Sequence, residues 1–124
     1  MSVKLTIREV NHVSVVDVSG RITLGDGSST LRDALRSMAG EGKKKILLNL
    51  KDVFYIDSSG LGALVSSFAT LTSQGVQLKL LNLTLRVKDL LMITKLLTVF
   101  EFYDSEETAL SSFIEVAAKA PTGG

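Results

Sequence analysis

Four consecutive residues, Asp57-Ser58-Ser59-Gly60, place one carboxylate and two hydroxyls directly after an apolar run. A serine hydroxyl can act as a nucleophile, accept a phosphoryl group from another protein, or cap a helix. Apolar residues then recur at helical spacing, at Leu61, Leu64, Val65, Phe68 and Leu71. The segment therefore predicts a strand followed by a helix, with the hydroxyls at the junction. In open α/β sheets, ligand sites lie at such carboxyl ends of strands.

Two kinds of chemistry fit this site poorly. A hydrolase would need a base beside Ser58, but the single histidine, His12, lies at the start of another predicted strand and has no second base to orient it. A receiver domain would use Asp57 as the phosphate acceptor and would need an acidic pair after its first strand to hold Mg²⁺. The first predicted strand ends in Arg8-Glu9-Val10, and no Asp-Asp pair occurs in the sequence.

A binding module that a partner phosphorylates requires fewer specific residues than these two classes, because Ser58 need only be accessible to the partner. Capping of the helix by Asp57, Ser58 and Ser59 alone is the remaining interpretation, and it is compatible with phosphorylation.

The length, composition and charge predict one domain that recognises its partners by shape and local chemistry. A chain of 124 residues with 45% hydrophobic content can bury a single core. Because the net charge is +1, we expect no direct nucleic-acid binding and no anionic membrane surface as partner. No apolar run approaches the ~20 residues of a membrane helix and no signal segment is apparent, so we expect a cytoplasmic protein. The sequence has no cysteine, and we expect neither a metal nor a cofactor.

Hydrophobic periodicity predicts the elements that position the junction. Residues 3–8 and 12–18 alternate as an antiparallel strand pair, and residues 46–50 and 76–81 read as further strands. Helical spacing covers residues 31–38, ending at Gly40, and then 61–71, 85–91 and 106–117, the last capped by Ser105. We therefore expect an α/β fold, a mixed central sheet with about four helices packed against it, over residues 1–118. Residues 119–124 are expected to form a flexible tail.

Three other segments could carry function. The Gly-rich stretch of residues 20–29 lacks the lysine of a phosphate-binding loop, so it is interpreted as a strand-to-helix connection with Ser28 or Ser29 as the cap. Lys43-Lys44-Lys45 precedes the strand whose other end carries Ser58, about 17 Å away, and is interpreted as a solvated turn. Met92 and Ile93 lie off the apolar side of their helix and are candidates for a partner surface.

The segment Asp57-Ser58-Ser59-Gly60-Leu61-Gly62, with residues 46–53 before it, closely resembles the phosphorylation site of bacterial anti-sigma factor antagonists, which are single STAS domains. The predicted order of elements fits that family from about residue 2 to about residue 116. The resemblance implies that Ser58 accepts the phosphate and that the loop containing Thr23 and Gly25 lies nearby in the partner surface. Many relatives have an acidic residue in place of Thr23 and a glycine in place of Lys95.

The family implies a phosphorylation switch. The unmodified antagonist binds a kinase-type anti-sigma factor, a histidine-kinase-like ATPase, and releases the sigma factor; phosphorylation of Ser58 prevents binding, and a phosphatase reverses it. No enzymatic activity of the chain itself is expected. The expected partner-binding residues are Thr23, Gly25, Asp57, Ser58, Ser59, Gly60, Leu61, Gly62, Met92 and Ile93. Two alternatives stay open: a constitutive STAS scaffold or transport-associated subunit, and a nucleotide-binding STAS module.

Overall fold

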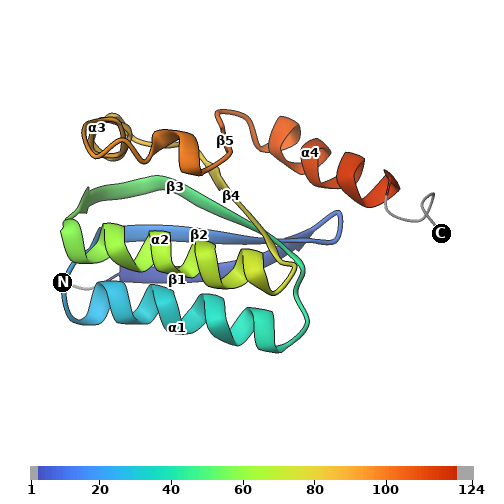
Figure 1. Ribbon diagram of the computed structural model, residues 1–124, viewed down its shortest axis with the longest axis horizontal. Helices are drawn as coiled ribbons and strands as arrows, with labels where there is room; N and C mark the ends of the chain where they lie inside the picture. The colour runs from blue at the N-terminus through green and yellow to red at the C-terminus, as the bar shows by residue number, and fades with distance from the viewer. Residues whose placement is uncertain (1–2, 120–124) are drawn as a thin grey trace.

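A computed structural model describes residues 3–119 of the chain, with the side chains of residues 3–113. The elements alternate as the periodicity predicts (Figure 1). In chain order they are β1 (Val3–Val10), β2 (Val13–Ile22), α1 (Asp26–Gly40), β3 (Lys45–Ile56), α2 (Ser58–Ser73), β4 (Gln77–Leu81), α3 (Leu85–Ile93), the 3₁₀ helix η1 (Leu97–Val99), β5 (Phe102–Tyr103) and α4 (Glu106–Lys119).

The strands form one mixed sheet in the order β1-β2-β3-β4-β5. β1 pairs antiparallel with β2, and the other three pairs are parallel. This arrangement confirms the predicted mixed α/β fold. Because β3 lies in the middle of the sheet and is its longest strand, it carries Asp57 and Ser58 to the end of the sheet where β2 also ends.

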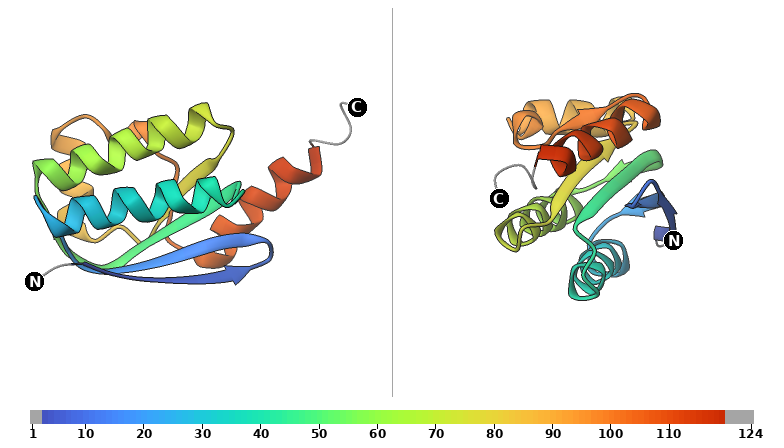
Figure 2. Two further views of the ribbon diagram at one scale, coloured as in Figure 1. Left: turned by 90° about the horizontal axis from the view of Figure 1, so that it is seen from below. Right: turned by 90° about the vertical axis from the view of Figure 1, so that its right-hand side faces the viewer.

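Successive side chains of the central strands point to opposite faces of the sheet and belong to two separate apolar clusters. The larger cluster includes Val16, Leu48 and Leu80 together with residues of α1 and α2. These two helices lie side by side on one face of the sheet (Figure 2). The smaller cluster uses the intervening positions Val15, Leu47 and Leu81, against which α4 packs. α1 and α2 thus cover one face of the sheet and α4 covers part of the other.

Two predicted helix ends are wrong in detail. Gly25, with φ 93°, is the N-cap of α1, and no side chain caps this helix. Ser28 therefore lies inside the first turn, because β2 continues to Ile22 and leaves only a short connection. At the other end, Gly40 is still helical and Gly42 adopts the left-handed conformation, with φ 89°. A glycine is favoured there because a Cβ atom disfavours positive φ.

Other local predictions are confirmed. Asp57 caps α2, and Ser105 caps α4 by accepting a hydrogen bond from the backbone N–H of Thr108 at 3.4 Å. Lys95, in the turn after α3, adopts the left-handed conformation with φ 62°, which is uncommon for a residue other than glycine. Strand β5 is only two residues long and was not predicted. Two apolar residues expected on the inner side of α4, Ile114 and Ala117, have side chains outside the described part, and residues 120–124 of the expected tail also lie outside it.

Candidate functional site

The Asp57 carboxylate joins two loops at the end of the sheet. Its Oδ1 accepts a hydrogen bond from the backbone N–H of Gly60 at 2.8 Å, which caps the first turn of α2. Its Oδ2 accepts one from the backbone N–H of Leu24 at 3.0 Å, in the connection between β2 and α1. The hydrogen bond from Gly60, and then that from Leu24, lowers the pKa of Asp57, because both favour the ionised carboxylate. The two loops are therefore held together by one anion.

The two serines of the site differ in accessibility. Ser58, the first residue of α2, is exposed. Ser59 is half-buried, and its Oγ lies 3.1 Å from the Oγ of buried Ser28. The Ser28 hydroxyl in turn donates to the backbone carbonyl of Thr23 at 2.8 Å. Ser59 is thus engaged in a local hydrogen-bond chain, and Ser58 is the hydroxyl that another protein can reach.

Two glycines let the helices approach the end of β2. A Cβ on Gly60 would overlap the backbone carbonyl of Ile22. A Cβ on Gly27, in the first turn of α1, would lie 2.7 Å from the carbonyl oxygen of Arg21. Both helix N-termini therefore begin directly beside β2, and the backbone N–H of Asp57 donates to Ile22 at 3.3 Å. By contrast, Gly62 has open space around it.

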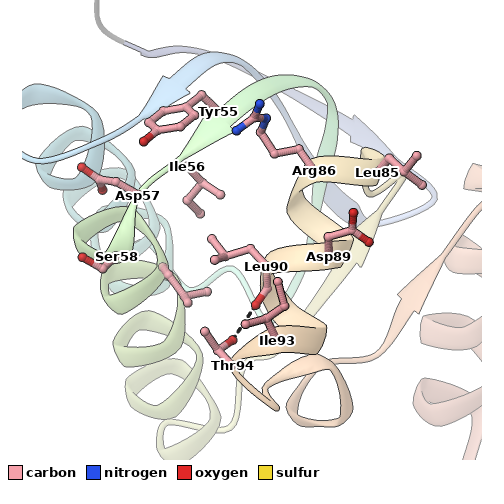
Figure 3. Close-up of a pocket in the computed structure, with 11 residues that line it drawn as sticks. Tyr55, Ile56, Asp57, Ser58, Leu85, Arg86, Asp89, Leu90, Ile93 and Thr94 are labelled. Atoms are coloured by element: carbon pink, nitrogen blue, oxygen red, sulfur yellow. Dashed lines mark hydrogen bonds between the residues drawn. The ribbon is translucent and has the colours of Figure 1, made fainter.

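A groove of about 810 Å³ runs beside Ser58 (Figure 3). Asp57 and Ser58 lie on one wall, and α3 forms the opposite wall. Leu85 and Ile93 on α3 are each 77% exposed, so the groove presents apolar side chains to solvent. The lining residues are Tyr55, Ile56, Asp57, Ser58, Leu61, Leu85, Arg86, Asp89, Leu90, Ile93 and Thr94.

The structure brings most of the expected partner-binding residues to this end of the molecule. Leu61 and Ile93 line the groove, whereas exposed Met92 does not. The loop of Thr23 and Gly25 joins the site through the Leu24–Asp57 hydrogen bond.

Sequence reasoning missed three exposed apolar side chains at this end. Leu24 is 79% exposed, and Tyr55 and Leu85 also present large exposed side chains. The available signal was Leu24 itself, an apolar residue within an otherwise polar, Gly-rich loop.

No histidine lines the groove, and the carboxylate next to Ser58, that of Asp57, accepts hydrogen bonds from the backbone N–H groups of Gly60 and Leu24. His12 lies at the β1–β2 turn, in a hollow of about 290 Å³ that it shares with Lys43, Lys44 and Lys45. That hollow lies at the start of β3, so the lysine cluster is far from Ser58, as predicted.

Within residues 3–113, no group of three or more His, Cys, Asp or Glu side chains could hold a metal ion. None of the described helices is long and apolar enough to cross a membrane.

The fold is that of a STAS domain, and the STAS domain family matches residues 4–109. The chain belongs to the STAS domain family. It is 32% identical over 123 residues to the anti-sigma-B factor antagonist of Bacillus subtilis, covering 99% of this chain and 98% of that protein.

Two solved structures share the fold. An anti-sigma factor antagonist from Mycobacterium paratuberculosis superposes with a TM-score of 0.78 at 21% identity, covering 89% of this chain and 92% of that one. The Bacillus cell fate determinant SpoIIAA in its phosphorylated form superposes with a TM-score of 0.68 at 17% identity, covering 89% and 99%.

Proposed function

We propose that this protein is an anti-sigma factor antagonist whose binding is switched off by phosphorylation of Ser58. The observation that carries the proposal is the position of Ser58, exposed at the start of α2 between the Asp57 cap and an apolar groove. The relatedness over nearly the whole chain to an anti-sigma-B factor antagonist supports the same assignment.

The geometry explains how a phosphate would act on binding more than on folding. A phosphoryl group adds about −1.5 to −2 charges and three acceptor oxygens. At the N-terminus of α2 that charge is favoured by the helix dipole. A partner that covers the groove must instead desolvate it beside the ionised Asp57, which is a second anion. Phosphorylation should therefore weaken partner binding while the domain stays folded.

The relatedness to an anti-sigma-B factor antagonist supports an anti-sigma factor as the partner. Phosphorylation of Ser58 needs a phosphoryl donor as well as an exposed hydroxyl, and in this proposal a partner kinase supplies ATP, Mg²⁺ and the catalytic groups. We propose that this kinase is the anti-sigma factor itself, of the histidine-kinase-like ATPase type, acting in the cytoplasm. A separate phosphatase would restore the binding form.

Phosphate mapping tests the assignment of Ser58. The protein is incubated with such a kinase and ATP, and the peptide that contains both serines is analysed by mass spectrometry. We expect phosphate on Ser58, loss of phosphorylation in Ser58→Ala and normal phosphorylation in Ser59→Ala. Phosphate on Ser59 in the wild-type protein would refute the assignment.

A further inference from the structure

A small hollow between α1 and α2 gathers two guanidinium groups and three hydroxyls. It has a volume of about 160 Å³ and is lined by Arg32, Arg36, Ser66, Ser67, Thr70 and Leu71. α1 supplies the two arginines, and α2 supplies the other four residues. Ser67 lies nine residues after Ser58, which is about 14 Å along the axis of α2. The hollow is therefore separate from the phosphorylation site.

The positive charge of the hollow is not neutralised within the described part of the chain. Arg32 and Arg36 are four residues apart on α1, so their side chains share one side of the helix. Neither forms an ion pair with a described carboxylate, in contrast to Arg8, which pairs with two. Like charges at this spacing repel, and an anion between them would remove that repulsion.

Ser67, on the α2 side of the hollow, is buried. It is only 4% exposed, and its Oγ is the one buried side-chain polar atom among the described residues that lacks a hydrogen-bond partner. Its helical neighbours differ: the hydroxyls of Ser66 and Ser73 donate to carbonyls of α2 at 3.3 and 2.7 Å. A buried hydroxyl without a partner destabilises the fold, and an anion bound in the adjacent hollow could supply the missing partner.

We propose that this hollow binds a tetrahedral oxyanion of the phosphate class. Arginine is suited to such an ion because its planar fork donates two parallel hydrogen bonds. The volume of about 160 Å³ leaves room for one phosphoryl group. Rotation about one side-chain torsion would let the Ser67 hydroxyl donate to the bound ion, beside the hydroxyls of Ser66 and Thr70. The site goes beyond the proposed switch and needs no modification of Ser58.

NMR titration of the full chain with inorganic phosphate tests the site, with sodium chloride holding the ionic strength constant. We expect saturable shifts of the amide signals in residues 32–37 and 66–71. Arg32→Gln and Arg36→Gln should each weaken binding by about tenfold, the effect of losing one hydrogen bond to a charged group. Lys4→Gln removes the same charge from β1 and should bind phosphate as the wild-type protein does.

Ser67→Ala separates a ligand-binding hydroxyl from a packing residue. If the hydroxyl donates a hydrogen bond to the ion, Ser67→Ala should bind phosphate more weakly by about three- to tenfold, while its Tm without phosphate is equal to or above that of the wild-type protein.

Titration with glycerol 3-phosphate in parallel distinguishes the source of the phosphate. Tighter binding than inorganic phosphate assigns an organic phosphomonoester as the ligand, and weaker binding assigns the free ion. Shifts that do not saturate, or that are unchanged in both arginine variants, would overturn the proposal.

Discussion

At the scale of single residues, Asp57 is the residue on which the site geometry depends. Its two carboxylate oxygens hold the backbone N–H groups of Gly60 and Leu24, which are 36 residues apart in the chain. One side chain thus fixes both the first turn of α2 and the loop that presents Leu24. The loop that carries exposed Leu24 is therefore tied to the residue directly before Ser58.

Acid titration measures this role of Asp57. Because the two N–H groups lower its pKa, the carboxylate should titrate below the ordinary value of 3.8. The ionised carboxylate therefore stabilises the folded site above pH 3.8, and this stabilisation is lost as the pH falls through the lowered pKa. NMR should show the amide signals of Leu24 and Gly60 shifting together with this midpoint. In Asp57→Asn the shared acid-dependent shift should be absent; its persistence would assign it to another group.

Gly60 and Gly62 form a matched pair for substitution by alanine. A Cβ on Gly60 meets the carbonyl of Ile22, so Gly60→Ala should destabilise the fold by about 1–3 kcal/mol, the range for overpacked sites. A Cβ on Gly62 meets nothing, so Gly62→Ala should stabilise α2 by up to about 1 kcal/mol through helix propensity. Urea unfolding measures both values. Equal stabilities of the two variants would show that α2 does not need its close approach to β2.

At the scale of elements, α4 is attached to the sheet by charge as well as by apolar contact. Arg8 on β1 pairs with Asp17 on β2 at 2.7 Å and with Glu106 in the first turn of α4 at 2.7 Å. Asn49 on β3 also donates to Asp17 at 2.8 Å. These contacts connect three strands to the start of α4, next to the smaller apolar cluster.

Arg8→Gln tests this attachment. The Arg8 guanidinium lowers the pKa of Glu106 and of Asp17, so both should stay ionised below their ordinary values of 4.5 and 3.8. The side chains are more than a third exposed, so solvent screening limits the expected loss of unfolding free energy to about 1 kcal/mol at pH 7. Because the stabilisation from lowered carboxyl pKa values is complete above those ordinary values and is lost as the pH falls through the lowered ones, the difference from wild type should shrink below about pH 4. A difference that is constant from pH 7 to pH 2 would contradict the ion-pair account.

The elements show which features a sequence can predict. Strand-to-helix alternation and the Asp57 cap follow from local periodicity and from a short-range hydrogen bond, and both are confirmed. Ser28 was assigned wrongly as a cap because its partners are the carbonyl of Thr23 and the hydroxyl of Ser59, and the Ser59 contact exists only after folding. The groove was not predicted because α3 and the end of β3 meet only in the tertiary structure. Strand β5 is too short to show periodicity.

At the scale of the whole molecule, the two ends of the sheet differ in character. One end carries Ser58, the Leu24 loop and the apolar groove. The other carries His12 and three lysines around a polar hollow. The switch that we propose would therefore act at one end only, and the core between the two ends need not change.

Substitution of Ser58 should leave folding almost unchanged. Ser58→Glu places an anion in the first turn of α2, where the helix dipole contributes about 0.3 to 1 kcal/mol. Repulsion from Asp57 roughly offsets this gain, and Ser58→Ala removes only an exposed hydroxyl. We expect both variants to melt close to wild type. A large fall in Tm for Ser58→Glu alone would mean that phosphorylation acts through unfolding rather than through the binding surface.

The affinity for the anti-sigma factor, measured by calorimetry for four forms of the protein, tests the central claim most directly. Unmodified protein and Ser58→Ala should bind with similar affinity. Protein phosphorylated on Ser58 should bind more weakly by about thirty-fold to several-thousand-fold, corresponding to a loss on the order of 2 to 5 kcal/mol, and Ser58→Glu should show part of that loss. Equal affinity of the unmodified, phosphorylated and Ser58→Glu forms would contradict the switch and identify a scaffold that binds its partner constitutively.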